Sequence, residues 1–313
     1  MKRIMCIGVL ALAAHAQESG VDFTFSTFSV PGAVVLGVES INDNSVIGGY
    51  YMDAAGNYKG FVRSAAKVLT TYADPADTRP LTFTESYQIN DAGVAVCQFF
   101  NSAENADSGF FYNTGTQTYT TYDVPGQPEG TTTAVLGINS NGSQFCGYLS
   151  APPYTTTSAF ISVNGKVTVY SVNGSTLTEC TGMNATGFTV GFYNDASGVS
   201  HGFMRSLKGA ITVVDYPGAS TTAAPLPCGG TAGGTVLSGT SDREDTSGYY
   251  WDTEHNEHGF ARSPDASYSP INYPGAFQTG AGGTNTHGTV VGFYLDTACN
   301  PSAYIAYRPA GGH

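Results

Sequence analysis

The sequence predicts an all-β fold, a six-bladed β-propeller with four-stranded blades. Three observations predict it: one motif recurs six times, each repeat divides into four short strand-like pieces, and no segment after the first 16 residues has a helical pattern. The motif is a polar residue or His, then Gly or Ala, then an aromatic residue. Its copies begin at Lys59, Ser108, Ser158, His201, His258 and Ser302. Intervals of 43 to 57 residues, filled only by short strands, are typical of propeller blades.

The repeat around His201 shows the four expected strands most clearly. They cover residues 177–183, 188–193, 201–206 and 210–216. The segments between them are rich in Asn, Asp, Gly and Pro. These residues form turns because Asn and Asp bond their own backbone, Gly adopts positive φ and Pro fixes φ. The same turn residues return in the other repeats, so we expect the same four strands in each.

The two ends of the chain are expected to share one blade. The sixth repeat ends after its third strand, residues 303–308. The segment 23–30, followed by Pro-Gly-Ala at 31–33, matches the fourth strand and turn of other repeats, as at 216–219 and 273–276. We therefore expect the N-terminal strand to complete the last blade and close the ring. Insertion of this strand into a neighbouring molecule is the alternative.

The first 16 residues have the pattern of a secretory signal peptide. Lys2 and Arg3 precede an apolar run over 4–13, and Ala14-His15-Ala16 is a small-residue cleavage site. The run is too short to span a bilayer, so no membrane insertion is expected. We expect residues 1–16 to be removed and residues 17–313 to form a single six-bladed propeller domain, secreted or held at the cell surface.

The chain is acidic, with a formal net charge of −12 and only 12 Lys and Arg residues. Nucleic acids and anionic membranes attract basic surfaces, so neither is an expected partner. No cofactor is expected, with Ca²⁺ as the one ion to consider. Four Asp residues open equivalent hairpins, where they either cap the turn or offer carboxylates to Ca²⁺: Asp53, Asp195, Asp252 and Asp296.

Five cysteines remain after the signal segment, an odd number, and an exported protein permits disulfides. Cys146 and Cys180 fall on strands of successive repeats and are the first expected pair. Cys228 and Cys299 are the second. Reduced, buried thiols are the alternative for all of them.

Two copies of the repeated motif read His-Gly-Phe, at 201–203 and 258–260, with Gly-Phe-Tyr-x-Asp at 191–195 and Asp-Tyr-Pro-Gly-Ala at 215–219 beside the first. In these motifs the chain resembles the HAF family of bacterial extracellular repeats, named after a His-Ala-Phe signature. The other four copies have Lys or Ser in place of the His. The resemblance covers nearly the whole chain after residue 16. It implies export and a repeat fold, and it implies no activity or catalytic residues.

The segment 252–258 is the densest cluster of reactive groups, with three acids and two His. If the protein is an enzyme, Asp252, Glu254, His258 and the equivalent His201 are the candidate catalytic residues. A metal would use Asp252, His255 and His258, because imidazole and carboxylate suit transition metals. An exposed polar turn explains the same residues, and no nucleophile elbow or phosphate loop accompanies them.

Aromatic residues are the candidates for ligand contact. The chain has 20 Tyr, 17 Phe and one Trp. Tyr50, Tyr249 and Trp251 are the candidates, since a ring on an exposed face would stack on a sugar. Alternation along a strand also places such rings between blades, where they would be core.

Two functions are consistent with these features. The first is a secreted, non-catalytic propeller that binds an extracellular glycan or assembles with itself into a surface layer or fibre. The second is a secreted carbohydrate-active enzyme, a polysaccharide hydrolase or lyase with its site in the central funnel. The lack of a catalytic motif favours the first.

Overall fold

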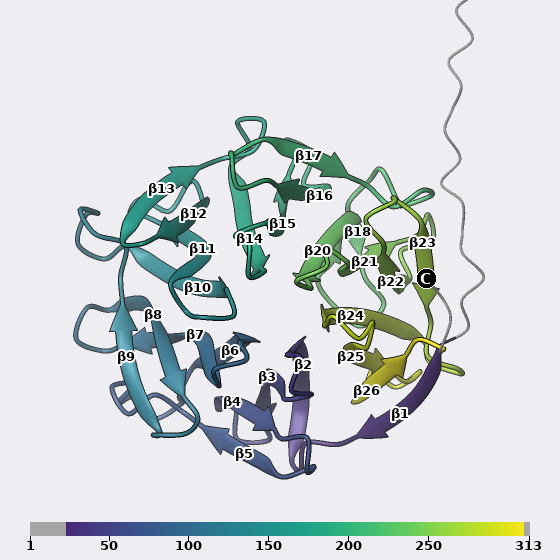
Figure 1. The fold of residues 1–313 in the computed structure, drawn as a ribbon, viewed down its shortest axis with the longest axis horizontal. Coiled ribbons are helices and arrows are strands. Elements are labelled where there is room, and N and C mark those ends of the chain that lie inside the picture. Colours follow the sequence, from purple (N-terminus) through teal and green to yellow (C-terminus); the bar gives the residue numbers. More distant parts are fainter. Residues whose placement is uncertain (1–22, 310–313) are drawn as a thin grey trace, which may run out of the picture.

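The computed structural model describes residues 23–309, and its sheets stand around a common central axis (Figure 1). Every element of regular secondary structure assigned in this part of the chain is a β-strand, so the prediction of an all-β fold is confirmed. No helix there is long and apolar enough to cross a membrane. The expected signal peptide, residues 1–16, lies outside the described residues.

The strands follow one another around the axis in six groups, and within each group neighbours pair antiparallel (Figure 1). The first group has β2 (Ala33–Ile41), β3 (Ile47–Asp53), β4 (Tyr58–Arg63) and β5 (Leu69–Tyr72). The second has β6 (Thr84–Ile89), β7 (Val94–Asn101), β8 (Ala106–Asn113) and β9 (Thr118–Tyr122). The third has β10 (Thr132–Ile138), β11 (Gln144–Ser150), β12 (Ser158–Val163) and β13 (Lys166–Tyr170).

The fourth group has β14 (Leu177–Met183), β15 (Thr189–Asn194), β16 (Ser200–Arg205) and β17 (Ile211–Val214). A small hairpin, β18 (Ala224–Pro225) with β19 (Thr231–Ala232), precedes the fifth group. That group has β20 (Gly234–Thr240), β21 (Thr246–Trp251), β22 (Glu257–Arg262) and β23 (Tyr268–Ile271). The sixth has β24 (Gln278–Thr284), β25 (Val290–Leu295) and β26 (Pro301–Tyr307).

β1 (Thr24–Phe28) begins the described chain but pairs with β26 near its end, from Thr24 opposite Tyr307 to Phe28 opposite Ala303. The strand order of this sheet is therefore β1-β26-β25-β24. One parallel pair, Ser200 with Gly234, also links β16 to β20, so the fourth and fifth groups belong to one sheet.

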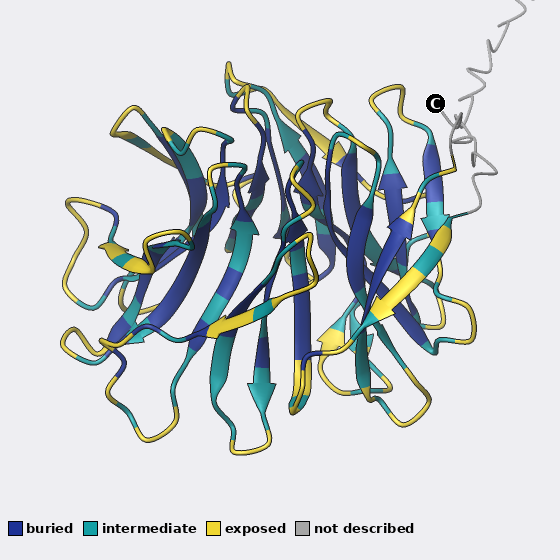
Figure 2. Cartoon of the chain, turned by 60° about the horizontal axis from the view of Figure 1, so that its bottom comes forward, coloured by how far each residue is buried: buried dark blue, intermediate teal, exposed yellow. Residues whose placement is uncertain are grey.

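The repeated sequence motif forms the packed centre of each group. Its small residue allows close approach, because a Cβ at Gly60 would lie 2.6 Å from the Tyr72 ring and one at Gly109 would lie 2.7 Å from Val135. Figure 2 shows buried residues along the strands and exposed residues at the loops. The motif aromatics are all 0% exposed: Phe61, Phe110, Phe160, Phe203, Phe260 and Tyr304.

The turn after the innermost strand ties neighbouring groups together. The Asn42 side chain accepts the N–H of Val46 (2.8 Å) and donates to the Asn90 carbonyl in the next group (2.9 Å). Asn285 donates in the same way to the Asn42 carbonyl, from the sixth group back to the first (3.1 Å). Equivalent bonds run from Asn90 to Asn139 and from Asn184 to Ser241.

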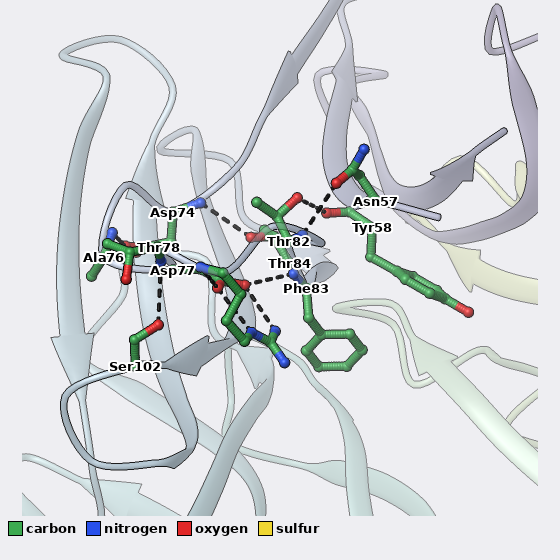
Figure 3. A network of polar contacts seen from close by, with 11 residues as sticks. Asn57, Tyr58, Asp74, Ala76, Asp77, Thr78, Thr82, Phe83, Thr84 and Ser102 are labelled. Atoms are coloured by element: carbon green, nitrogen blue, oxygen red, sulfur yellow. Dashed lines mark hydrogen bonds and ion pairs between the residues drawn. The ribbon is translucent and has the colours of Figure 1, made fainter. Parts of the chain in front are cut away.

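The link between the first and second groups is held by a buried acid (Figure 3). The Asp77 carboxylate accepts the N–H of Phe83 (2.6 Å) and the guanidinium of Arg79 (2.9 Å). The N–H of Thr82 donates to the Asn57 side chain (3.2 Å). These bonds fix the entry of the chain into β6, a strand that contributes to the central cavity described below.

Two disulfides join separate groups. Cys146–Cys180 connects β11 to β14, and Cys228–Cys299 connects the β18–β19 hairpin to the β25–β26 loop. These are the two pairs that the sequence suggested. Cys97 is a buried free thiol, and burial raises its pKa to about 12.

Candidate functional site

A central cavity lies between the inner strands of the groups. It has two adjoining parts of about 440 Å³ and about 220 Å³. Both parts are lined by Glu39, Tyr50, Ser238 and Tyr249. The larger part adds residues of β24 and β25, and the smaller adds residues of β6, β14 and β15. Volumes of this size suit a small organic ligand.

Two glycines, which have no side chain, leave room for groups at the cavity. Gly37 is opposite Tyr50 in the β2–β3 register, and a Cβ at Gly37 would lie 2.5 Å from both the Glu39 carboxyl and the Tyr50 ring. A Cβ at Gly280 would lie 2.5 Å from the Glu257 carboxyl and 2.7 Å from the Phe293 ring. Any larger residue at 37 or 280 would therefore displace groups at the cavity.

Glycines on the second strands let the next residue reach the cavity. A Cβ at Gly248 would collide with the carbonyl oxygen of Val236 on β20, so β21 approaches β20 closely only because residue 248 is Gly. The residue after it, Tyr249, lines the cavity. Gly49 before Tyr50 and Gly191 before Phe192 have the same relation to their inner strands.

Two carboxyls face the cavity without a hydrogen bond or ion pair to any described residue: Glu39 and Glu179. Burial, with a smaller contribution from the negative charge of Glu85, raises the pKa of Glu39 to about 7. The same causes raise the pKa of Glu179 to about 7. Both groups therefore change charge near neutral pH.

A third carboxyl, Glu85, is held by its neighbours. It accepts hydrogen bonds from the Tyr87 hydroxyl and from Gln98, each at 2.7 Å. Gln98 in turn accepts from the Tyr148 hydroxyl (2.8 Å). Burial still raises the pKa of Glu85, although these bonds oppose the rise.

A fourth carboxyl, Glu257, stands beside Gly280 and Phe293 at the wall of the larger part. It is 9% exposed, and its Oε1 has no hydrogen-bond partner. Burial and then the charge of Glu39 raise its pKa to about 7. Neither part of the cavity has a Lys, Arg or His in its lining, so no basic group balances these acids.

Three further acids converge near one end of the axis. One carboxylate oxygen each from Asp43, Asp91 and Asp242 lies within 4.8 Å of the others, the one such group of three among residues 23–309. Asp43 accepts the N–H of Thr286 (2.9 Å), and Asp91 accepts the N–H of Asp43 (2.9 Å). Each acid thus already bonds a neighbouring group. Ca²⁺ takes about six to eight oxygen ligands, so three carboxylates alone do not define a calcium site.

Tyr50 and Tyr249, two of the ligand-binding residues suggested by the sequence, line the cavity. Trp251 does not. It is 6% exposed and packs edge-on against Tyr249, with ring centres 5.3 Å apart. Alternation on β21 places both rings on one face, and only the inner one reaches the cavity.

The candidate catalytic and metal residues of the 252–258 segment are absent from the lining of the cavity. Asp252 accepts the N–H groups of Glu254 (2.8 Å) and Asn256 (2.9 Å), which is turn capping. His258 lies between Asp252 and Asn272, with each ring nitrogen 3.0 Å from an oxygen. Among the described residues, Asp252, His255 and His258 form no three-ligand group.

His201 and the other hairpin acids behave in the same way. His201 lies 3.0 Å from Asp215 and stacks on Tyr193, away from the cavity lining. The remaining three hairpin acids each accept two N–H groups of their own turn: Asp53, Asp195 and Asp296. Turn capping, and not calcium binding, is thus the role that their contacts support.

The acids of the cavity were not predicted from the sequence. Glu85 and Glu179 lie at the matching position of β6 and β14, where the other inner strands have small or apolar residues: Gly37, Ala134, Val236 and Gly280. Glu39 lies at a different position, two residues nearer the end of β2. An alignment of the six inner strands would have singled them out as charged residues in buried strands. Glu257 was seen only as part of the hairpin cluster.

No protein-family model and no curated protein matches this chain. Solved structures do match its fold. Aleuria aurantia lectin in complex with Fucα1-6GlcNAc aligns over 91% of this chain and 100% of the lectin, with a TM-score of 0.51 and 14% identity. Another structure of that lectin, also at a TM-score of 0.51, is described as a six-bladed β-propeller with fucose recognition.

TolB from Acinetobacter baumannii aligns with a TM-score of 0.54 and 11% identity over 84% of this chain. The chain spans 64% of the length of that TolB. At such identities the similarity concerns the fold alone. The chain has the fold of these β-propellers.

Proposed function

We propose that this chain is a non-catalytic glycan-binding protein of the cell exterior, with its binding site in the central cavity. The lining carries the proposal: Tyr50, Tyr249 and Phe192 supply aromatic walls, and Glu39 and Glu179 offer carboxyls without partners among the described residues. Small-molecule sites combine apolar or aromatic walls with a few placed polar groups, and a sugar uses both.

The proposal includes a closed ring of six four-stranded blades, with β1 completing the last. The pairing of β1 with β26 and the bond from Asn285 to Asn42 support closure. Closure matters for binding, because the cavity lining combines residues from the first group with residues from the fourth, fifth and sixth.

A location outside the cell is supported by the two disulfides, which persist in oxidising compartments, and by the signal-peptide pattern of residues 1–16. Membership of the HAF family, a single domain over residues 17–313 and a place at the cell surface belong to the same proposal.

Binding is preferred over hydrolysis because of the acids themselves. Glycosidases pair a protonated acid with an ionised one, and different surroundings push their pKa values apart. Here burial raises the pKa of Glu39 and of Glu179 to the same value, about 7. The lining holds no carboxyl with a lowered pKa to serve as the ionised partner.

Self-assembly by exchange of β1 between copies is the weaker form of the binding hypothesis. β1 is already paired with β26 of its own chain. Exchange between copies would therefore first have to break this pairing within the chain.

A glycan array probed with the purified secreted protein, followed by calorimetry on the hits, tests the proposal. We expect binding of at least one small saccharide. Tyr50→Ala and Tyr249→Ala should each weaken it about tenfold, since a stacked ring contributes on the order of 1–2 kcal/mol. Tyr307→Ala is the matched control, because Tyr307 lies on β26 and is 43% exposed.

Absence of binding across the array would contradict the proposal. Release of reducing ends from a bound polysaccharide, lost in Glu39→Gln or Glu179→Gln, would replace it with the hydrolase. Equal loss of binding in Tyr307→Ala would place the site outside the cavity.

A further inference from the structure

The cavity has an unusual charge balance for a sugar site. Glu39 and Glu179 face it directly, Glu85 lies behind Tyr87 and Gln98, and Glu257 lies beside Phe293. The phenols that face the same space are those of Tyr50, Tyr87 and Tyr249, and burial raises the pKa of each, which keeps them neutral. No Lys, Arg or His belongs to the lining of either part.

Carboxyls that are shielded from bulk water are usually paired, but of these four acids only Glu85 has hydrogen bonds among the described residues. Within the described residues, Glu39 and Glu179 have no hydrogen bond and no ion pair. Glu257 is 9% exposed, and one of its oxygens has no partner at all. A carboxyl that is shielded from water without a partner is destabilising, more so when it is ionised, so a donor supplied by a ligand would offset that cost.

We propose that the saccharide bound in this cavity carries a free ammonium group, so that the natural ligand is an amino sugar held between Glu39 and Glu179. The inference rests on the proposed function and narrows its ligand class. The ammonium donates hydrogen bonds to the two carboxylates, and the sugar ring lies against Tyr50 and Tyr249.

An organic cation fits the lining better than a metal ion does. The walls offer aromatic rings, which attract an ammonium group through their negative faces. Ca²⁺ and Mg²⁺ require about six or more oxygen ligands in close array, and aromatic walls do not supply them. The larger part, about 440 Å³, has room for a sugar ring as well as the charged group.

The pH dependence has a definite sign. Because burial raises the pKa of Glu39 and Glu179 to about 7, both are mostly neutral at mildly acidic pH and ionised above neutral pH. An ammonium ligand should therefore bind more tightly as pH rises from about 5 to about 7. A neutral sugar should show no such increase.

Calorimetry with glucosamine, N-acetylglucosamine and glucose tests the inference, because the three share a ring and differ at one substituent. We expect glucosamine to bind about tenfold more tightly than the other two, as a charge-assisted hydrogen bond would give. Glu39→Gln and Glu179→Gln should each remove most of this preference and flatten its pH dependence. Glu129→Gln, an exposed acid on a loop, is the matched control and should change neither.

Each other outcome has a distinct meaning. Equal binding of all three sugars would overturn the amino-sugar inference and leave glycan binding standing. Binding of putrescine as tightly as glucosamine, with no binding of neutral sugars, would overturn the sugar part and point to a simple amine. Failure of every saccharide and of putrescine would overturn both this inference and the proposed function.

Discussion

The hairpin segment 252–258 and the central cavity both contain carboxyls beside aromatic rings. They differ in whether those carboxyls have hydrogen-bond partners. In the hairpin, Asp252 and His258 bond each other and their own turn. In the cavity, Glu39 and Glu179 have no described partner. The pKa values follow: partial burial raises that of Asp252, but hydrogen bonds from Asn256 and His258 bring it below its usual value, whereas burial, with a smaller contribution from the charge of Glu85, raises those of the cavity acids.

The difference separates residues that hold the fold from residues that are free to bind. A carboxylate whose oxygens accept backbone N–H groups stabilises a turn and has few acceptor positions left for a ligand. A carboxyl left unpaired in an enclosed space costs stability, so a ligand that pairs it gains affinity. In the sequence, the cluster of acids and His indicated the hairpin as the candidate site. In the structure, the carboxyls without partners indicate the cavity instead.

The largest expected effect comes from the disulfide at the cavity. Cys228 and Cys299 line its larger part, so C228S together with C299S should cost about 4 kcal/mol of stability and also weaken ligand binding. Urea unfolding and calorimetry measure the two effects. The control is C146S with C180S, which should cost a similar amount without changing binding, since neither cysteine lines the cavity. Equal effects on binding would show that the cavity responds to any loss of stability.

Next in size is Gly248→Ala. A Cβ at 248 collides with the Val236 carbonyl, so β21 must move away from β20 at a cost of about 3 kcal/mol, taking Tyr249 out of position. Chemical unfolding should show the loss. Gly115→Ala is the control: its Cβ would lie 3.4 Å from Asn113 on an exposed turn, and the change should stay within about 0.5 kcal/mol. A tolerated Gly248→Ala would contradict the close strand approach.

The pH dependence of stability sharpens the comparison further. Glu39, Glu179 and Glu257 have folded pKa values of about 7 against an ordinary value of 4.5, so the folded state binds more protons than the unfolded state between these pH values. Stability should therefore fall as pH rises from about 4.5 to about 7. Thermal unfolding across this range measures it.

Glu39→Gln with Glu179→Gln should flatten that pH slope, because Gln mimics the protonated acid. The hairpin acids act in another window. Their lowered pKa values, as for Asp195 at about 2, give stability that is present above the ordinary pKa of 3.8 and lost as pH falls toward 2. A stability maximum above neutral pH would mean that the cavity acids are ionised and paired.

The smallest effect is expected for His258→Ala. It removes the contacts to Asp252 and Asn272 and should cost about 1 kcal/mol, with glycan binding unchanged. His201→Ala should behave alike, since His201 has an equivalent contact to Asp215. Loss of binding or of glycan turnover in His258→Ala at unchanged stability would restore the hairpin as the functional site.

Much of the architecture was readable from local patterns. The His-Gly-Phe motif predicted the repeat, and its aromatic residue, such as Phe203, is fully buried in every copy. Residues 23–30 were matched to a missing fourth strand by their Pro-Gly-Ala turn, and β1 pairs with β26. For the site, Tyr50 and Tyr249 could be suggested as aromatic residues on strands, while Trp251, on the same strand as Tyr249, lies in the core.

The sequence by itself determined the strands, the turns and the six-fold repeat, because alternation, Gly and Pro act through neighbouring residues. Only the tertiary structure decided which acids matter. Glu39 and Glu179 are far apart in the chain, and they share a cavity because β2 and β14 face the same axis. Whether these two acids have hydrogen-bond or ion-pair partners also depends on the side chains of the strands across the cavity. Contacts between strands that are far apart in the chain depend on how the sheets are arranged about the axis, which no local pattern encodes.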